Sequence, residues 1–292
     1  MRAKSAFHEF DSMINTNSST SEIKIIEAPS GWQLIDWREL WRYRDLFYFL
    51  VWRDIKTRYA QSILGVGWAV IQPLFTMIVF TIVFGNLAQI SSDGVPYAIF
   101  SYTALVPWTY FSSALSAATS SLINASGMIS KVYFPRLVIP LAPVLGKLVD
   151  FAIAMLILFA LMLWFGFFPT IWTLTLPLLI LLMMLTAAGL GMWLTALAVQ
   201  YRDINYAMGF VIQLLMYAAP VVYPASNVPA QYRLLYGLNP MVGVIEGFRS
   251  ALLGTNPMPW DFLLVGTLTA LVIAISGALY FRRMERVFAD VV

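Results

Sequence analysis

The sequence predicts an all-α integral membrane protein with six transmembrane helices, and three observations predict this class. Of its 292 residues, 60% are hydrophobic and only 11% are charged, against about 45–50% and about 25% in an average soluble domain. The mean hydropathy is +0.76. Long uncharged runs recur along the chain, and one of them covers the 51 residues from Phe151 to Tyr201. This composition excludes a soluble enzyme or nucleic-acid-binding protein, because too little polar surface is left to keep it dispersed.

The uncharged runs set the predicted spans, since a helix needs about 20 apolar residues to cross a hydrocarbon core about 30 Å thick. The run from Phe151 to Tyr201 would extend about 77 Å as one helix, so it must turn back. Gly166 to Pro169 is the predicted breaker. The runs together predict spans at 65–87, 98–122, 141–165, 172–199, 205–223 and 261–281.

The basic residues set the predicted orientation and division of the chain. Of the 18 Lys and Arg residues, 16 fall on segments of one side and two, Arg233 and Arg249, on the other. Because cytoplasmic segments carry the excess of positive charge, both termini are expected in the cytoplasm. We expect a polar, flexible cytoplasmic tail over 1–36, an amphipathic interface helix over 37–60, a six-span transmembrane domain over 61–283 and a cytoplasmic C-terminal tail over 284–292.

The segment before the first span predicts a helix that lies on the membrane. Its apolar residues recur at helical spacing and share one face: Trp37, Trp41, Tyr48, Trp52, Ile55 and Tyr59. Its charge density forbids spanning, and its tryptophans favour the headgroup level. Two roles stay open: an anchor that only positions the first span, or a lever that receives force from a cytoplasmic partner.

The connection between spans 2 and 3, Ile123 to Pro140, is longer than a turn requires. It predicts a short helix at about 126–132, with Pro135 as a stop. Met128, Ile129 and Tyr133 place apolar groups on the aqueous side. These groups either dip back into the interface or form a knob that docks in a partner's groove, and we favour docking.

The connection between spans 5 and 6 predicts a re-entrant helical hairpin. Asn239 and Pro240 match the N-cap and first position of a helix, which then runs from Met241 to Leu253 and stops at Gly254. Such a helix reaches only about 20 Å, too short to cross, and a shorter helix is expected over 228–236. Glu246 and Arg249 lie three residues apart and can neutralise each other. The hairpin is either a structural pair or an outer gate.

Much chemistry is missing from the sequence. It has no cysteine, one histidine, no phosphate-binding Gly-x-x-x-x-Gly-Lys-Ser/Thr loop, no metal-ligand cluster and no nucleophile–base set. Ionisable groups near the middle of the spans, which mark coupled carriers, are also missing. Lys147 and Asp150 lie nearest, at one end of span 3, and are expected to pair or to snorkel. The pattern argues against an enzyme or a coupled secondary carrier and favours a chain that draws its energy from a partner.

An ordered set of short motifs then points to a family. The set comprises Arg53-Asp54-Ile55-Lys56-Thr57-Arg58-Tyr59, Ser62, Leu64-Gly65, Trp68, Pro73-Leu74, Phe134-Pro135-Arg136, Pro140, Tyr201-Arg202-Asp203-Ile204, Asn239-Pro240, Glu246 and Arg249. Over residues 37–283 the sequence resembles the membrane-spanning (permease) subunit of ABC-type polysaccharide exporters, the type-2 exporters of O-antigen, capsule or teichoic acid.

The resemblance implies a homodimer that forms a channel, with two copies of a separate nucleotide-binding ATPase beneath it. The partner would bind ATP and Mg, and this chain would hold no cofactor or metal and have no catalytic residue. The substrate would be a polyprenyl-pyrophosphate-linked polysaccharide crossing the bacterial inner membrane, O-antigen first. The alternatives are capsule or teichoic acid, or a drug or small lipid. The implied ATPase-coupling residues are Arg53, Asp54, Lys56, Arg58, Tyr59, Ser126, Met128, Ile129, Lys131, Tyr133 and Arg136.

Aromatic residues are candidates for a glycan path, because sugar rings present C–H groups to aromatic faces. The candidates are Trp68, Phe75, Trp108, Tyr110, Phe111, Tyr206, Tyr217 and Tyr223. Membrane-interface belts are the alternative explanation for any one of them. Arg53, Lys56 and Arg58 could likewise hold a pyrophosphate or be ordinary cytoplasmic-side charges. The outer gate would comprise Asn239, Pro240, Glu246 and Arg249.

Overall fold

The computed structural model describes residues 41–60, 65, 67–129 and 134–291, and this part of the chain is helical, without strands. The all-α prediction is confirmed for it. The expected tail over 1–36 and the candidates Lys131 and Tyr133 lie outside the described residues.

In the part of the chain that the structure describes, four helical segments are long and apolar enough to cross a membrane. The first joins α4 (Gly67–Phe80) to the π-helical η1 (Thr81–Leu87), and the second joins α7 (Val138–Gly146) to α8 (Leu148–Phe165). The third joins the short 3-10 helix η2 (Ile171–Thr175) to α9 (Leu176–Gln200), and the fourth is α13 (Trp260–Val291). Predicted spans 1, 3, 4 and 6 are confirmed as such helices, and Gly166 ends α8 as expected.

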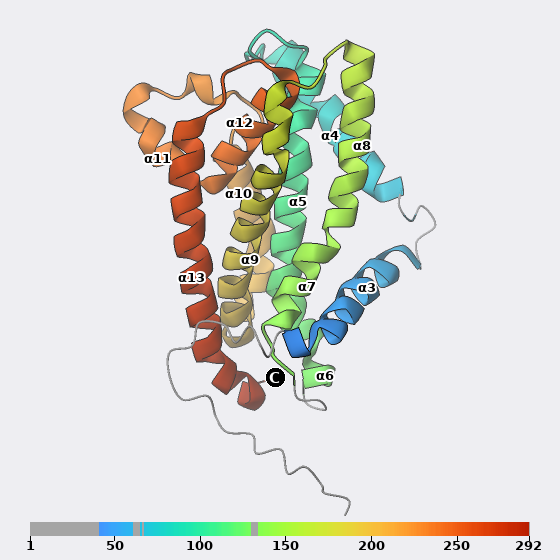
Figure 1. Cartoon of the computed structure of the whole chain (residues 1–292), viewed down its shortest axis with the longest axis vertical. Coiled ribbons are helices and arrows are strands. Elements are labelled where there is room, and N and C mark those ends of the chain that lie inside the picture. Colours follow the sequence, from blue (N-terminus) through green and yellow to red (C-terminus); the bar gives the residue numbers. More distant parts are fainter. Residues whose placement is uncertain (1–40, 61–64, 66, 130–133, 292) are drawn as a thin grey trace, which may run out of the picture. The chain divides into compact units, whose positions relative to one another are not determined.

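The second predicted span corresponds to α5 (Tyr97–Asn124), which is long enough to cross but is rich in Ser and Thr. It is the central helix, packed against α4, α7, α8, α9, α10 and α12 (Figure 1). Nineteen of its 28 residues are buried. Its role as a membrane span stays a prediction.

The fifth predicted span, 205–223, is wrong at its C-terminal end. The helix here, α10 (Asp203–Tyr217), has 15 residues, and residues 218–223 are not helical. Pro220 explains the stop, because its ring would clash with the carbonyl four residues earlier. At 1.5 Å per residue α10 extends about 23 Å, less than the hydrocarbon thickness. Whether α10 crosses a membrane is likewise left as a prediction.

The predicted helical pair between spans 5 and 6 is present as helices. The 3-10 turns η3 (Ala225–Asn227) and η4 (Ala230–Tyr232) lead into α11 (Arg233–Gly237), and α12 (Pro240–Leu253) follows. Asn239 caps α12 by accepting from the Met241 N–H at 3.1 Å, and Gly254 ends it with a left-handed φ of 66°. All 14 residues of α12 are buried. Re-entry into a membrane stays a prediction.

Two short elements are described in part, and one helix end differs from the predicted bounds. Within the described residues the interface helix is α3 (Arg44–Ala60), and the connection after α5 contains the four-residue helix α6 (Ser126–Ile129). The rest of the helix predicted at 126–132 lies outside the described residues. Residues 284–291, expected as a tail, continue α13 to Val291. Charged residues in that last part do not stop a helix, because Arg and Glu are good helix formers.

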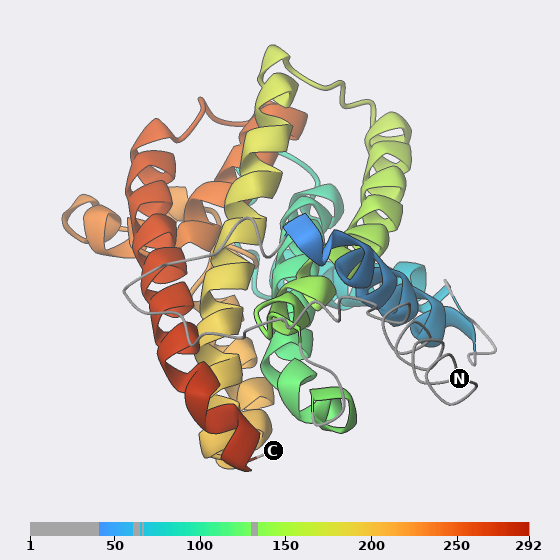
Figure 2. The same ribbon diagram turned by 60° about the horizontal axis from the view of Figure 1, so that its bottom comes forward.

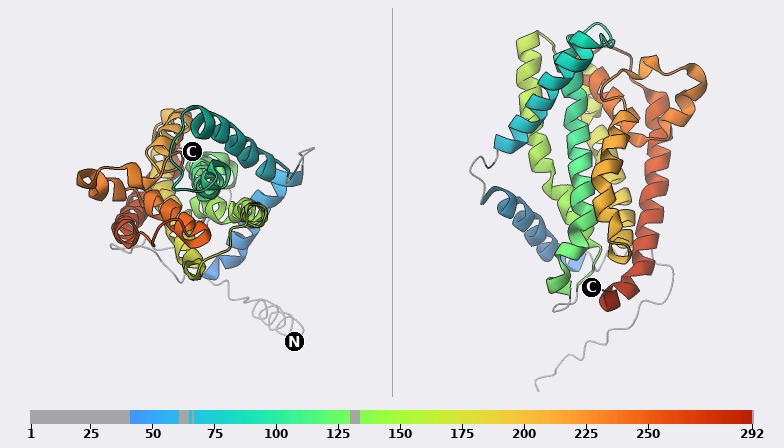
Figure 3. Two further views of the ribbon diagram at one scale, coloured as in Figure 1. Left: turned by 90° about the horizontal axis from the view of Figure 1, so that it is seen from above. Right: turned by 180° about the vertical axis from the view of Figure 1, so that it is seen from behind.

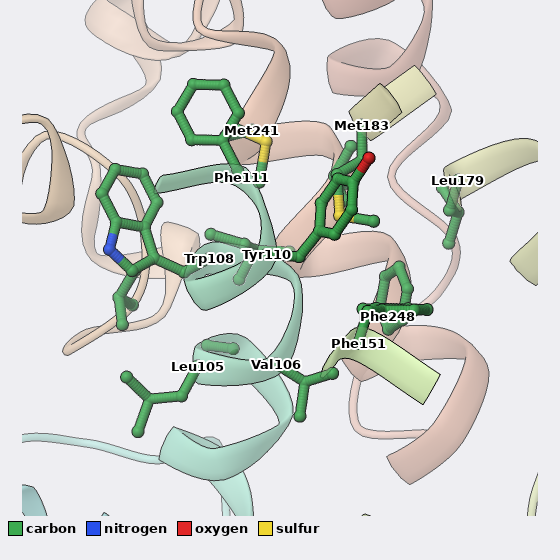
Figure 4. Packing of buried hydrophobic residues seen from close by; sticks show 14 of the residues in the cluster. Leu105, Val106, Trp108, Tyr110, Phe111, Phe151, Leu179, Met183, Met241 and Phe248 are labelled. Carbon is green, nitrogen blue, oxygen red and sulfur yellow. The ribbon is translucent and has the colours of Figure 1, made fainter. Parts of the chain in front are cut away.

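The core lies where α5, α8, α9 and α12 meet. Tyr110 and Phe248 both pack on Phe151 in edge-to-face geometry, with ring centroids 5.7 and 6.2 Å away (Figure 4). Figures 1 and 2 show α6, the start of α7 and the end of α13 together at one end. We call it the basic end, because Arg136 precedes α7 and Arg282 and Arg283 lie in the last part of α13. Helix α12 and the α8–α9 connection lie at the opposite end.

Candidate translocation and coupling site

One side of α5 carries a row of hydroxyl groups that keeps some exposure. The residues recur every three or four positions, so they share a helix face: Thr109, Ser112, Ser113, Ser116 and Ser120. Three of these side chains, Ser112, Ser113 and Ser120, also donate to carbonyls of their own helix, as in the 3.2 Å contact from Ser112 Oγ to the Thr109 oxygen. A polar helix face is unfavourable against lipid tails, and it suits a protein contact or a water-filled path.

Exposed aromatic side chains stand on the two helices beside this row. From behind, α5 is seen between α4 and α10 (Figure 3), and it packs on both. On α4, Trp68 and Phe75 are exposed, Phe75 at 65%. On α10, Tyr206 is 86% exposed and Tyr217 is also exposed. These four predicted glycan-path residues therefore lie on the open surface of the chain.

Three other predicted glycan-path residues lie in the core, which corrects that prediction. Trp108, Tyr110 and Phe111 are all buried, and Trp108 and Tyr110 leave α5 on opposite sides (Figure 4). The Tyr110 hydroxyl donates to the Val144 carbonyl at 2.8 Å, which ties α5 to α7. Composition alone could not place them, because aromatic rings serve equally well in packing and in sugar contact.

The remaining aromatic candidate, Tyr223, joins α10 to the helical pair. Its hydroxyl donates to the Tyr217 carbonyl at 2.9 Å and lies 3.2 Å from the Tyr236 hydroxyl. Burial, and then the bond to Tyr223, raises the pKa of Tyr236. Tyr236 therefore stays protonated as a hydrogen-bond donor near neutral pH.

The four residues predicted as an outer gate lie together at the start and in the middle of α12. Glu246 and Arg249 form the predicted ion pair, with Arg249 Nη1 2.8 Å from Glu246 Oε1. Only 1% of the Arg249 side chain and 8% of the Glu246 side chain are exposed. The Asn239 side-chain amide also donates to the Ala218 carbonyl at 3.4 Å. Pro240 is buried at the first helical position.

The buried pair has further partners that fix the chain leaving α10. Arg249 Nη2 donates to the Val221 carbonyl at 3.1 Å, and Glu246 Oε1 accepts from the Ala225 N–H at 3.1 Å. The guanidinium also lies 3.6 Å from the centre of the Phe100 ring on α5. The pair therefore fastens residues 221–225 and α12 to the central helix, although Arg249 Nε is buried without a hydrogen-bond partner among the described residues.

The predicted coupling residues on α3 divide between its two sides. Arg53 and Lys56 are exposed, whereas Asp54, Arg58 and Tyr59 are half-buried toward α8. Arg58 contacts Asp54 Oδ2 and Asp150 Oδ2, each at 2.7 Å. The Tyr59 hydroxyl donates to Asp150, and burial together with this bond raises the pKa of Tyr59 to about 12.

The predicted pair of Lys147 and Asp150 is confirmed, with Nζ 3.2 Å from Oδ2. Asp150 therefore accepts from Lys147 on its own segment and from Arg58 and Tyr59 on α3. Sequence spacing identified the local pair but missed the contacts from α3, because residues some 90 positions apart leave no periodic signal.

The remaining described coupling candidates lie at the basic end. Ser126, Met128 and Ile129 on α6 are half-buried, and Met128 packs on the chain's own apolar clusters. Arg136 donates to the Glu285 carbonyl near the end of α13, and its own N–H donates to the Glu285 side chain at 3.3 Å. Because α6 packs partly against its own chain, it exposes less surface for docking to a partner than a fully exposed helix would.

A small cavity of about 140 Å³ lies between Met128 and Ser120, the last residue of the hydroxyl row. Arg53 and Asp54 line it from α3, Ser120 and Asn124 from α5, and Met128 from α6. The lower end of the α5 face thus opens beside the interface helix. Neither the row nor the cavity was among the predicted sites, although the spacing of the Ser residues could have indicated the row.

Comparison with known proteins gives a consistent result. Residues 45–253 match the family described as ABC-2 type transporter. The chain is 29% identical to the O-antigen export system permease protein RfbA of Myxococcus xanthus over 73% of this chain and 82% of that protein. It is 24% identical to RfbA of Klebsiella pneumoniae over 85% of this chain and 95% of that one. The polysialic acid transport protein KpsM of Escherichia coli is 24% identical, over 80% and 91%.

Proposed function

Because the chain belongs to the ABC-2 type transporter family, whose members similar to it are polysaccharide-export permeases, we propose that it is the channel-forming permease subunit of an ATP-driven exporter. Two copies would face each other across the surface formed by α4, α5 and α10. Two copies of a separate ATPase would bind at the basic end, and ATP and Mg would be held there rather than in this chain.

The observation that carries this proposal is the hydroxyl row of α5 flanked by exposed aromatic rings on α4 and α10. Hydroxyl groups can exchange hydrogen bonds with sugar hydroxyls along a path, and aromatic faces can stack on sugar rings without selecting one linkage. A surface of this kind on a central helix suits a long polar polymer better than a compact lipophilic cargo.

The proposed cargo is a lipid-linked polysaccharide that moves from cytoplasm to periplasm, with O-antigen as the first choice. The O-antigen export permeases among the relatives support this choice. Capsular polysaccharide is the second candidate, supported by similarity to KpsM and to the capsule polysaccharide export inner-membrane protein CtrC of Neisseria meningitidis. We place the chain in the inner membrane with both termini in the cytoplasm, as its basic residues predict.

Gene deletion tests the function. Loss of the chain should remove long surface glycan while its lipid-linked precursor accumulates inside, and a plasmid copy expressed with its ATPase should restore export. Loss of capsule with intact lipopolysaccharide would select the second candidate. Unchanged glycan together with altered drug or lipid efflux would overturn the polysaccharide proposal.

A bulky residue in the hydroxyl row tests the path. Ser116→Trp should reduce surface glycan by about tenfold or more. A blocked path stops transport as a whole, whereas the loss of a single contact would only weaken binding. The matched control is Leu156→Trp, since Leu156 is an exposed apolar residue on α8. Equal export by both variants would contradict a path along α5, provided that both accumulate to wild-type amounts in the membrane.

A further inference from the structure

Helix α3 is attached to the membrane helices at two places on either side of a break. In its middle, Leu50 is buried with Val138 and Ala142 of α7. At its end, Arg58 and Tyr59 bond to Asp150 in the first turn of α8. Helix α7 ends at Gly146 and α8 begins at Leu148. Helix α3 therefore contacts both α7 and α8, one on each side of the break between them.

The attachment to α8 is a closed set of ionic contacts, which we call the α3–α8 joint: Asp54, Arg58, Tyr59, Lys147 and Asp150. Its two carboxylates and two cations balance in charge. Arg58 contributes two separate nitrogens, one to each carboxylate. Ion pairs with several directional hydrogen bonds fix orientation as well as distance, whereas the apolar contact at Leu50 is non-directional and tolerates sliding.

A glycine makes room for the joint. A Cβ atom placed on Gly146 would lie 2.8 Å from Asp54 Oδ2, closer than carbon and oxygen atoms that are not bonded can approach. The carboxylate of Asp54 thus rests directly against the backbone where α7 ends. This close contact positions Asp54 to hold Arg58, and Arg58 in turn reaches Asp150.

We propose that Asp150 is a positioning residue for transport, because it makes α3 and α8 move as one body. This inference rests on the proposed function, in which the ATPase pushes on α3. A displacement of α3 would pass to α8 through the joint, which also holds Asp54 against the end of α7 at Gly146. Helix α8 packs against α4 and the central helix α5, so the movement would reach the proposed path.

The first test uses the full permease with its ATPase partner. Asp150→Asn keeps the shape of the side chain and removes its charge, and we expect ATP hydrolysis and complex assembly to persist while glycan export per ATP falls about tenfold. Asp150→Glu should recover part of the export. The control is Asp261→Asn, an exposed carboxylate at the start of α13.

The outcomes separate the two proposals. Wild-type complex that exports no glycan would overturn the proposed function. Wild-type export together with an unchanged export-to-ATP ratio in Asp150→Asn would overturn the joint alone. A fall in export that only matches a fall in assembled complex would also overturn it, because a merely structural role predicts that result.

A second test exploits the absence of cysteine from the chain. Arg58→Cys with Asp150→Cys removes the central contact of the joint, so export per ATP should fall. Bridging the two thiols with a short bis-methanethiosulfonate should restore it, since a covalent link also makes α3 and α8 one body. Each single-cysteine variant with the same reagent is the control. Bridged protein no better than these controls would overturn the proposal.

Discussion

Two clusters in this protein are both built from ion pairs between basic side chains and carboxylates, but their surroundings differ. The pair of Glu246 and Arg249 lies within one helix and is nearly inaccessible to solvent. The α3–α8 joint connects two helices, and its four charged side chains keep 17–33% of their surface exposed. Water partly solvates the joint and screens its charges, whereas the buried pair depends entirely on protein partners. We therefore expect the buried pair to contribute mainly to stability and the joint to transmit movement from α3 to α8.

The largest effect is expected from Arg249→Met, which leaves the Glu246 carboxylate buried without its cation. Loss of one member of a buried pair lowers the free energy of unfolding by about 3–5 kcal/mol. Thermal unfolding of the purified protein in detergent should show this as a large fall in midpoint. Arg233→Met is the control, since Arg233 is exposed and only lies over the Phe262 ring. A midpoint equal to that of the control would contradict the assignment.

A charge exchange should fail to rescue the buried pair. With Glu246→Arg and Arg249→Glu, position 246 would face the Ala225 N–H with a cation and position 249 the Val221 carbonyl with a carboxylate. A donor would face a donor at position 246 and an acceptor would face an acceptor at position 249, so we expect the double variant to stay at least about 2 kcal/mol less stable than wild type, the scale of unsatisfied buried polar groups. Full recovery in the unfolding midpoint would show that charge neutrality alone holds the pair.

Gly146→Ala probes the joint through its shape, and its effect should be intermediate. The new methyl group must displace the Asp54 carboxylate, and overpacking of this kind costs about 1–3 kcal/mol. Gly127→Ala is the control, because a Cβ atom there would meet nothing within 4 Å. Equal unfolding midpoints for both variants would show that α3 does not rest on the α7 backbone.

The smallest stability effect is expected from Asp150→Asn. Partly exposed ion pairs contribute about 1 kcal/mol or less each, so its unfolding midpoint should fall far less than that of Arg249→Met. The difference between wild type and variant should also shrink as salt is raised, because salt screens exposed charges. A loss as large as that of Arg249→Met would erase the distinction between the two clusters.

Interactions between residues close together in the sequence were sufficient to predict several features of this protein. The Asn239–Pro240 start and the Gly254 stop of α12 were predicted because capping depends on a few neighbouring residues. The pairs Glu246–Arg249 and Lys147–Asp150 were predicted from helical spacing, since residues three apart face the same side. The fifth span was predicted to end at 223, near Pro220 and Pro224, whereas α10 ends at Tyr217, because the uncharged run extends beyond the helix.

Contacts between distant segments were beyond such reasoning. Trp108 and Phe111 were expected on a glycan path and lie in the core, because an aromatic residue gives no sign of which helix covers it. The complete burial of α12 and the contacts of Arg58 with Asp150 were likewise not predicted.

By itself the sequence determined that this chain belongs in a membrane, where four apolar helices lie along the chain, and where α12 begins and ends. These features follow from the hydrophobicity of each segment and from helix capping, which depend on residues close together in the sequence. The tertiary structure decided which side of α5 is polar and open, which charges are buried, and that α3 is fastened across the α7–α8 break. Those features depend on which helices become neighbours, and that choice is made by packing between residues far apart in the sequence.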